Sequence, residues 1–509
     1  MNGAIPDPQA ALRRTVYALL IAASAGVMLG RILAVDSVDK IGLEEFLLKQ
    51  IPEQLDQRRE EFVEQGLSSR QIEEKLGRIE KSLRQRAALR RPFLSANDRS
   101  RWCTLRALVE ASVRVPGAPY AIDKVIQEPG WDTIDMVKHD GHLYSSKPPL
   151  FPTLMAAEYW LIHRLTGASL GTHPYQIGRF MLVTINVLPL IVYFLVLSRL
   201  VERFGTTDFS RVFVMAAATF GTLLTTFAVV LNNHLPAAVS VVIALYAAVR
   251  IWFDGERRLR YFVVAGVFSA FAAANELPAL SFLGLMSLAL LWKAPRPTLL
   301  AYVPAAAVIA AGFFFTNWVA HGDLAPAYAH RDDGGENWYD YTYQRNGRTI
   351  ESYWRNRVGI DRGEASPATY ALNVLVGHHG IFSLSPIWIL AAVGLGLWLI
   401  KPEDRQLRWL ASFVLILSLV CLVFYLSRPQ DDRNYGGMTA GFRWMFWFAP
   451  LWLVTMLPAA DRMAAGRWRR GLAYILLAIS ALSASYPIWN PWTHPWLLNY
   501  MHYLGWIQV

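Results

Sequence analysis

Long apolar stretches, separated by short polar segments, set the pattern of hydrophobic and polar positions along this chain. Two of them, residues 183–197 and 303–315, contain no charged residue at all. A helix needs about 20 mostly apolar residues to cross the hydrocarbon core of a bilayer, and stretches near that length recur along the sequence. The pattern therefore predicts an all-α polytopic membrane protein.

We expect about eleven transmembrane helices, each an apolar stretch bounded by polar or basic residues. They cover residues 15–33, 180–197, 212–230, 235–248, 261–274, 277–292, 299–320, 381–400, 410–425, 445–457 and 472–485.

The short connections between these stretches predict the orientation of the chain. Basic residues gather in alternate connections, such as 249–260, 401–409 and 458–471, whereas the connections 231–234 and 275–276 contain no Lys or Arg. Because short cytoplasmic loops are enriched in Lys and Arg, we expect a cytoplasmic N-terminus. The first apolar stretch is interpreted as an uncleaved span, since it is long for a signal peptide and no small-residue cleavage site follows it.

Composition agrees with a membrane protein and excludes other classes. Of the 509 residues, 54% are hydrophobic and 17% charged, whereas soluble domains carry roughly 25% charged residues. The net charge of +10 resides largely in the short loops, so it indicates orientation and not nucleic-acid binding. Cys103 and Cys421 are too few for a disulfide framework.

The spans divide the chain into six parts, and the long external segments differ in composition. Within the second part, residues 43–88 are charged and helix-forming, with Ser68 and Gln71 placed as a capping box; we expect a helical hairpin that is structural or docks an unknown partner. The parts are 1–35, the cytoplasmic N-terminus and first span; 36–91, the external hairpin insertion; 92–177, an external juxtamembrane catalytic loop; 178–320, spans two to seven; 321–380, a large external loop; and 381–509, spans eight to eleven with an external tail.

Two external patterns carry candidate chemistry. Asp98 precedes the amphipathic stretch 105–109 and could act as a general base on a hydroxyl or hold a metal ion. Alternatively it is a helix N-terminal carboxylate that pairs with Arg101. Lys147 precedes Pro148 and Pro149, which hold it in an extended conformation at a helix start, where it could meet a lipid phosphate. The alternative is a snorkelling interfacial lysine.

Further candidates lie at the outer ends of the predicted spans. Glu276 sits at the apex of two short spans, where an ionisable group is costly and is usually functional. Arg443 follows a glycine-rich segment and could grip a phosphate with two N–H groups. Adjacent histidines point apart on a helix, so His378 and His379 are expected to contact a sugar hydroxyl sooner than to share a metal. The expected substrate-binding residues are Tyr144, Arg179, His234, Glu276, His378 and His379.

The order of these pieces resembles a known family. An acid before an amphipathic helix, then Lys147-Pro148-Pro149, an aromatic helix and residues 177–180 resemble the polytopic glycosyltransferases of the C-type fold, in particular the protein O-mannosyltransferase and aminoarabinose transferase group. The resemblance implies that Asp98 is the acidic residue of the first external loop and that Lys147 contacts the donor phosphate. The chain departs from the group in having Arg99 after the acid and Ser146 before the lysine.

The resemblance implies a glycosyltransferase that moves a sugar from a polyprenyl-phosphate donor to an unknown protein, lipid or glycan acceptor at the outer, periplasmic face of a bacterial-type inner membrane. Asp98 would be catalytic, and Lys147 with Arg443 would bind the donor phosphate. No cofactor is assigned, and a divalent metal ion remains open, as does its ligand set. The rival hypothesis is a non-catalytic lipid-binding scaffold or a transporter for lipid-linked sugars; the absence of an internal repeat counts against transport.

Overall fold

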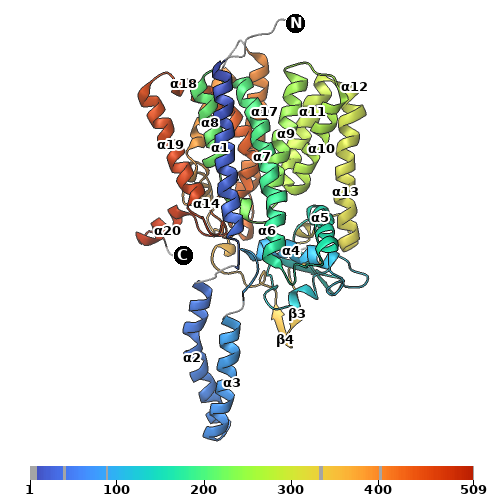
Figure 1. Ribbon diagram of the computed structural model, residues 1–509, viewed down its shortest axis with the longest axis vertical. Helices are drawn as coiled ribbons and strands as arrows, with labels where there is room; N and C mark the ends of the chain where they lie inside the picture. The colour runs from blue at the N-terminus through green and yellow to red at the C-terminus, as the bar shows by residue number, and fades with distance from the viewer. Residues whose placement is uncertain (1–7, 38–41, 88–89, 332–335, 401–403, 508–509) are drawn as a thin grey trace.

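The computed structural model describes residues 8–37, 42–87, 90–331, 336–400 and 404–507 as a mostly helical bundle (Figure 1). The long helices run side by side, and one end of the bundle carries a projecting helical hairpin together with several short elements. We refer to this as the hairpin end. The first helix begins at the opposite end, where the N-terminus lies.

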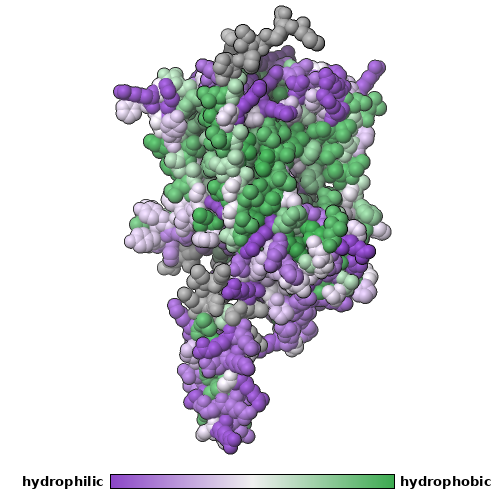
Figure 2. Space-filling model, in the orientation of Figure 1, coloured by the Kyte–Doolittle hydropathy of each residue, from purple (hydrophilic) through white to green (hydrophobic). Residues whose placement is uncertain are grey.

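Within the described ranges, five helical stretches are long and apolar enough to cross a membrane: Gln9–Leu33, Pro174–Phe204, His234–Trp252, Pro295–His321 and Arg405–Leu426. Three shorter apolar helices accompany them: Leu259–Asn275, Leu277–Lys293 and Ile387–Ile400. Figure 2 shows the result as an apolar band between two polar ends. The prediction of a membrane protein with several apolar helices is confirmed, but eleven spans are not.

Two of the predicted spans are not continuous helices, because single residues interrupt them. The stretch 212–230 is helical only as far as Phe220 in α8 (Asp208–Phe220), and Gly221 ends it. The stretch 381–400 is divided into α15 (Ile381–Leu384) and α16 (Ile387–Ile400). Pro386 explains this break, because the residue before a proline is pushed out of the α region, and Ser385 has φ −129° and ψ 70°.

Small residues allow the helices to pack closely. A Cβ at Gly266 of α10 (Leu259–Asn275) would lie 2.3 Å from the carbonyl oxygen of Tyr302. A Cβ at Gly394 of α16 would lie 2.0 Å from the carbonyl oxygen of Thr455. Glycine at these positions lets the backbones approach, as in other membrane helix pairs.

The projecting hairpin consists of α2 (Gly42–Glu64) and α3 (Ser69–Ala87), as expected for residues 43–88 apart from Ala88, which lies outside the described residues. The backbone N–H of Ser68 donates to Gln71 Oε1 at 3.1 Å, which is half of the expected capping box. Ile51, Ile72 and Leu76 are buried along its seam.

Among the described residues the hairpin end also contains two small antiparallel sheets, so the fold is not strictly all-α. Strand β1 (Met136–His139) pairs with β2 (His142–Ser145), and β3 (Thr342–Arg345) pairs with β4 (Arg348–Glu351). Their turns are Asp140-Gly141 and Asn346-Gly347, all with positive φ. Such dipeptides favour the two-residue hairpin turn, so this correction has a clear signal in the sequence.

The remaining helices complete the framework. Their bounds are α1 (Pro8–Leu33), α4 (Ala96–Val109), α5 (Leu150–Thr166), α6 (Pro174–Leu182), α7 (Leu188–Phe204), α9 (His234–Trp252), α11 (Leu280–Lys293), α12 (Pro295–Pro297), α13 (Val303–His321), α14 (Pro367–Leu375), α17 (Arg405–Leu426), α18 (Ala449–Met463), α19 (Arg467–Ser485) and α20 (Trp496–Tyr503). Short η segments join them at Val125–Gln127, Val183–Val187, Thr226–Val229, Leu277–Ala279, Thr298–Tyr302, Ala327–Ala329, Gly359–Arg362, Gln430–Asp432 and Arg443–Phe448.

Candidate functional site

Asp98 lies in the first turn of α4, where the side chain of Ser95 caps the helix by accepting from the N–H of Asp98 at 3.0 Å. The Asp98 carboxylate accepts from the indole of Trp102 at 2.8 Å and from the backbone N–H of Leu231 at 2.9 Å. Its second oxygen faces the N–H of Leu94 at 3.4 Å. The residue is only 1% exposed, so its contacts are with the protein itself.

Burial raises the pKa of the Asp98 carboxyl to about 6, although the N–H groups of Leu231, Leu94 and Trp102 favour its charged form. The alternative pairing with Arg101 is wrong, because that guanidinium bonds other groups. Asp98 instead links α4 to the segment before α9.

Lys147 follows strand β2 and precedes the two prolines at the start of α5. Its ammonium group lies 2.9 Å from Asp135 Oδ2 and 3.0 Å from Oδ1. Asp135 also accepts from Asn97 Nδ2 at 2.7 Å and from the hydroxyl of Ser146. Lys147 keeps 24% of its side chain exposed, whereas Asp135 is buried. Asp135 therefore orients the lysine while leaving it accessible.

Lys147 and Asp135 each shift the pKa of the other. Burial pushes the pKa of the Asp135 carboxyl upward, but Lys147 and the hydroxyl of Ser146 outweigh it, and the pKa lies below its usual value. Burial lowers the pKa of Lys147, and Asp135 opposes part of that shift.

Arg101 projects from α4 beside this pair and is 3% exposed. Its Nε and Nη2 donate to Asn233 Oδ1 at 3.0 and 2.8 Å, and its Nη1 donates to Asn97 Oδ1 at 2.7 Å. Asn233 in turn donates to the carbonyl oxygen of Asn275 at 3.0 Å. Within the described part of the chain, every hydrogen-bond partner of this guanidinium is a neutral oxygen, so no carboxylate there contacts it and cancels its charge.

Glu276, His234 and Arg443 form a chain of contacts at the ends of three separate helical segments. His234 Nδ1 lies 2.5 Å from Glu276 Oε1, and Arg443 Nη1 lies 2.7 Å from His234 Nε2. Because the guanidinium can only donate, His234 Nε2 must be the acceptor and Nδ1 must carry the proton toward Glu276. Thus the glutamate fixes the histidine tautomer, and the histidine holds the arginine.

A glycine turn supports Arg443 from the other side. Arg443 Nε donates to the carbonyl oxygen of Gly436 at 2.8 Å. Gly436 and Gly437 have φ values of +97° and +79°, which L-residues with side chains rarely adopt. A Cβ at Gly436 would lie 2.9 Å from Arg443 Nε. The turn therefore requires glycine both for its conformation and for the close approach of the arginine.

Arg101, Lys147 and Arg443 together form what we call the cation cluster. Burial lowers the pKa of Arg101 to about 10, and Arg443 contributes to the lowering. Arg101 and Arg443 likewise depress the pKa of Lys147. The three cations, which come from α4, the start of α5 and the segment before α18, therefore lie within electrostatic reach of one another.

Other predicted site residues lie outside these contacts. Arg179 donates from Nε and Nη2 to the carbonyl oxygen of Val35 at 3.0 and 2.7 Å, which fastens α6 to the end of α1. Tyr144 is buried in β2, and its ring meets that of His321 edge-on with centroids 4.9 Å apart. These contacts are structural, and the substrate-binding role of both residues stays a prediction.

His378 and His379 are in a turn after α14 and not on a helix, so the expectation that they point apart is wrong. Their Nδ1 atoms lie 2.5 Å apart, and Tyr435 stacks on His379 with ring centroids 4.6 Å apart. Burial lowers the pKa of His378 to about 4 and that of His379 well below its usual range, so both are neutral near pH 7. Within the part of the chain that the structure describes, no three His, Cys, Asp or Glu side chains group to hold a metal ion.

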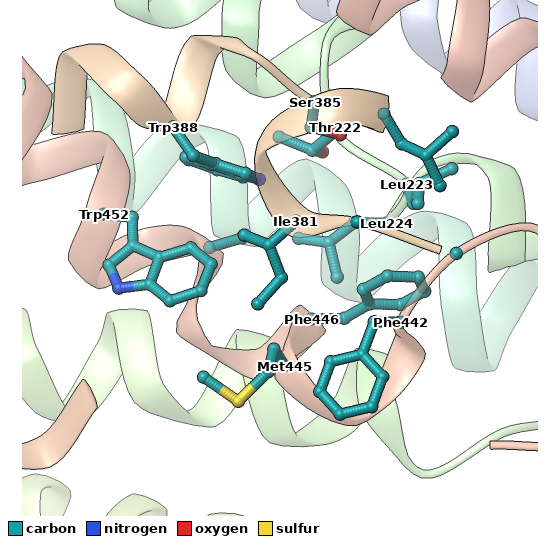
Figure 3. A pocket seen from close by; sticks show the side chains of 14 residues that line it. Thr222, Leu223, Leu224, Ile381, Ser385, Trp388, Phe442, Met445, Phe446 and Trp452 are labelled. Atoms are coloured by element: carbon teal, nitrogen blue, oxygen red, sulfur yellow. The ribbon is translucent and has the colours of Figure 1, made fainter. Parts of the chain in front are cut away.

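A narrow cavity is lined in part by the segment that carries Arg443 (Figure 3). Phe442, Met445 and Phe446, which flank Arg443 in sequence, line it together with Trp388 and Trp452. Phe446 also meets the ring of His234 edge-on, with centroids 6.0 Å apart. The cavity volume is about 30 Å³, enough for a water-sized group and too small for a lipid chain in this conformation.

Sequence reasoning missed Asp135, Asn97 and Asn233 and gave Arg101 a different role. None of these residues lies in a recognisable motif. Asp135 meets Lys147 because the β1–β2 hairpin folds back on itself, pairing Met136 with Ser145. The Asp-Gly turn was the available signal: locating the hairpin would have placed the residue before β1 next to the residues after β2.

Comparisons with known proteins find only distant similarity. No family model matches the chain, and no curated protein matches it. The crystal structure of the Archaeoglobus fulgidus oligosaccharyltransferase with Zn and sulfate is similar at 15% identity and a TM-score of 0.43, over 79% of this chain and 54% of that one. The archaeal oligosaccharyltransferase AglB from the same organism, in complex with an inhibitory peptide and a dolichol-phosphate, is similar at 13% identity and a TM-score of 0.35, over 79% and 56%. The chain spans about half the length of the structures it matches.

Proposed function

We propose that the chain is a membrane glycosyltransferase that transfers a sugar from a polyprenyl-phosphate donor to an acceptor. The observation that carries this proposal is the cation cluster. Arg101 and Arg443 bond neutral amide, carbonyl and imidazole atoms, and among the residues that the structure describes Lys147 alone of the three contacts a carboxylate. Buried charges are normally paired, so an arrangement that leaves two arginines without a contacting anion favours an anionic ligand.

A phosphate bearing a lipid is the anion that suits this position. Lys147 supplies a point charge and Arg443 a planar pair of donors, which are complementary ways of holding phosphate oxygens. When the bond between sugar and phosphate breaks, negative charge grows on the leaving phosphate. Fixed cations at that place stabilise the developing charge without having to reorganise.

The roles of the carboxylates follow from their surroundings. Asp135 holds Lys147, and Glu276 orients Arg443 through His234. Asp98, expected from the sequence to be the catalytic base, has its carboxylate committed to N–H donors of the protein. We therefore propose that it anchors the segment before α9 and does not contact the acceptor.

The location of the site and its need for metal also belong to the proposal. The hairpin end would face the periplasm of a bacterial-type inner membrane, with the N-terminus in the cytoplasm. A divalent ion remains a hypothesis, and no donor set for it is proposed.

The test is turnover of a panel of radiolabelled polyprenyl-phosphate sugars by membranes that contain the wild type or Lys147→Ala. We expect transfer or release of one sugar, reduced about 10²- to 10³-fold in the variant, as for removal of one charge-stabilising donor. Arg348→Ala, an exposed cation on β4, is the matched control and should retain wild-type turnover. Binding of a donor without turnover would favour the lipid-binding scaffold, and uptake of intact donor into vesicles would favour a transporter.

A further inference from the structure

Asp361 lies on the short turn Gly359–Arg362 of the large external loop, far in sequence from the residues predicted for the site. The hydroxyl of Tyr353 donates to its Oδ2 at 2.9 Å, and Asn434 Nδ2 approaches its Oδ1 at 3.4 Å. Among the described residues, no Lys, Arg or His forms an ion pair with it within 4.0 Å. Its side chain is half-buried, so it keeps a face open.

The glycine turn places this carboxylate next to the cation cluster. A Cβ at Gly437 would lie 3.4 Å from Asp361 Oδ1, and the carbonyl oxygen of Gly436 accepts from Arg443. Asp361 and Arg443 thus contact two consecutive residues of one turn. Any side chain at position 436 would intrude on the arginine, since its Cβ would lie 2.9 Å from Arg443 Nε. Glycine therefore brings both charged groups against the same short piece of backbone.

Asp361 differs from the other carboxylates around the cation cluster because its oxygens are not committed to a cation among the described residues and its side chain is partly exposed. Asp98 is committed to N–H donors, Asp135 to Lys147, and Glu276 to His234. A general base must come within hydrogen-bond reach of the proton it removes, which requires an oxygen that is accessible and not neutralised. Of these four, Asp361 is half-buried and the other three are buried.

The surroundings also tune Asp361 for proton transfer. Burial raises the pKa of its carboxyl; the hydroxyl of Tyr353 and the charge of Arg443 oppose the rise, and Asp135 adds to it. A carboxylate whose pKa is raised toward the working pH is a better base than an ordinary surface aspartate.

We propose that Asp361 is the catalytic base that activates the acceptor, an inference that rests on the proposed transferase function. Asp361 takes the proton from a neutral acceptor hydroxyl as the acceptor oxygen bonds to the anomeric carbon of the sugar. The bond between that carbon and the phosphate oxygen breaks, and its electron pair leaves with the lipid phosphate beside Lys147 and Arg443. Charge and atoms balance with no further reactant.

The experiment uses the purified full-length chain in lipid nanodiscs with the donor that the wild type turns over. We expect Asp361→Asn to lower kcat about 10²- to 10⁴-fold, the usual contribution of a general base, while donor affinity stays within about twofold, because the phosphate is held by other residues. Asp361→Glu should recover part of the rate. Asp140→Asn, an exposed aspartate in the β1–β2 turn, is the matched control and should keep the wild-type kcat.

A pH profile separates a base from a merely structural aspartate. The wild-type rate should fall on the acid side as Asp361 becomes protonated, and this limb should be absent in Asp361→Asn. Tyr353→Phe removes a donor that lowers the pKa of Asp361, so its acid limb should move to higher pH. This second variant tests the assignment even if Asp361→Asn does not fold.

The outcomes that overturn the proposals differ. A wild type that turns over its donor, together with an Asp361→Asn variant of unchanged kcat or an acid limb that Tyr353→Phe does not move, overturns the assignment of Asp361 alone. A wild type that transfers sugar from none of the donors overturns the transferase function and this assignment with it.

Discussion

Helix α4 carries two buried arginines whose surroundings are opposite in character. Arg106 is 2% exposed, and its guanidinium contacts two carboxylates, Glu110 at 2.7 Å and Glu128 at 2.5 Å. Tyr159 and the backbone N–H of Gly171 complete the hydrogen bonding of Glu110, at 2.6 and 3.2 Å. We call this group the Arg106 network. Arg101, just over one turn earlier, donates to amide oxygens and contacts no acid among the residues that the structure describes.

The comparison distinguishes two kinds of buried cation. One stabilises the fold by pairing with carboxylates of the protein, and the other is available to bind an anionic ligand. In the Arg106 network negative and positive groups meet and their hydrogen bonds are satisfied inside the protein, which joins α4, α5 and the loop between α5 and α6. In the cation cluster the two arginines donate to neutral groups, and among the described residues no carboxylate forms a hydrogen bond or ion pair with either guanidinium. Burial is nearly equal for Arg101 and Arg106, so the identity of the partners and not depth carries the functional information.

The largest expected effect on stability comes from breaking the Arg106 network. Arg106→Met should lower the free energy of unfolding by about 3–5 kcal/mol, because Glu110 is left as a buried charge without its partner. Arg443→Met should cost less stability, since no contacting carboxylate is orphaned, and should weaken donor-lipid binding instead. Tryptophan fluorescence during thermal unfolding of the purified variants measures the first, and lipid-binding titration the second. Equal destabilisation with unchanged donor affinity in Arg443→Met would remove the distinction.

The fold could be predicted from the sequence where the signal is local and strong. Apolar stretches near the length of a bilayer gave the long helices, such as residues 15–33 and 410–425, and charge with helix propensity gave the projecting hairpin. The Pro386 break and the early end of α8 at Gly221 were missed, because apolar composition masked single residues that interrupt a helix. Segments of that kind, half helical and half irregular, have the same hydropathy as a true span.

Several individual residues of the site could be predicted from the sequence, but the contacts between them could not. Lys147 was expected because two prolines follow it, Glu276 because it lies at the apex of two short spans, and Arg443 because it follows a glycine-rich segment. His234 was expected from its place in a short external connection. Their partners were not, because contacts such as Arg443 with His234 join segments far apart in sequence, and one chain has no periodicity that reports them. Asp98 was favoured for its place at a helix start, and that same place explains its structural contacts.

Asp98→Asn tests whether the Asp98 carboxylate has a structural role, like the carboxylates of the Arg106 network, or a role in the reaction at the cation cluster. Because burial raises the pKa of Asp98 to about 6, its stabilising contribution is present below the unfolded-state pKa near 4 and is lost as the pH rises through 6. The wild type should therefore lose up to about 3 kcal/mol relative to the variant between pH 4 and 6, because a tenfold change in an acid dissociation constant corresponds to about 1.4 kcal/mol. Thermal unfolding of both proteins across this range measures the difference.

The catalytic alternative for Asp98 gives a different result for turnover. If it were the base that the sequence suggests, Asp98→Asn would abolish turnover, whereas the pH dependence of unfolding follows from the raised pKa of its carboxyl in either case. A variant with full turnover and a pH-dependent separation places Asp98 with the structural groups.

The smallest perturbation asks whether the cation cluster and the projecting hairpin face the same compartment. Ser69 begins α3 in the exposed hairpin, and both native cysteines, Cys103 and Cys421, are buried. Ser69→Cys should change stability by less than about 0.5 kcal/mol, as an exposed substitution does, and should give one reactive thiol. We expect a membrane-impermeant maleimide to label it in intact cells.

Because the hairpin and the cation cluster lie at one end of the bundle, labelling would place the site outside the cytoplasm, where a lipid-linked sugar is the available kind of donor and a nucleotide sugar is not. Protection in intact cells with labelling after lysis would invert the topology, and the donor would then have to be sought among cytoplasmic anions.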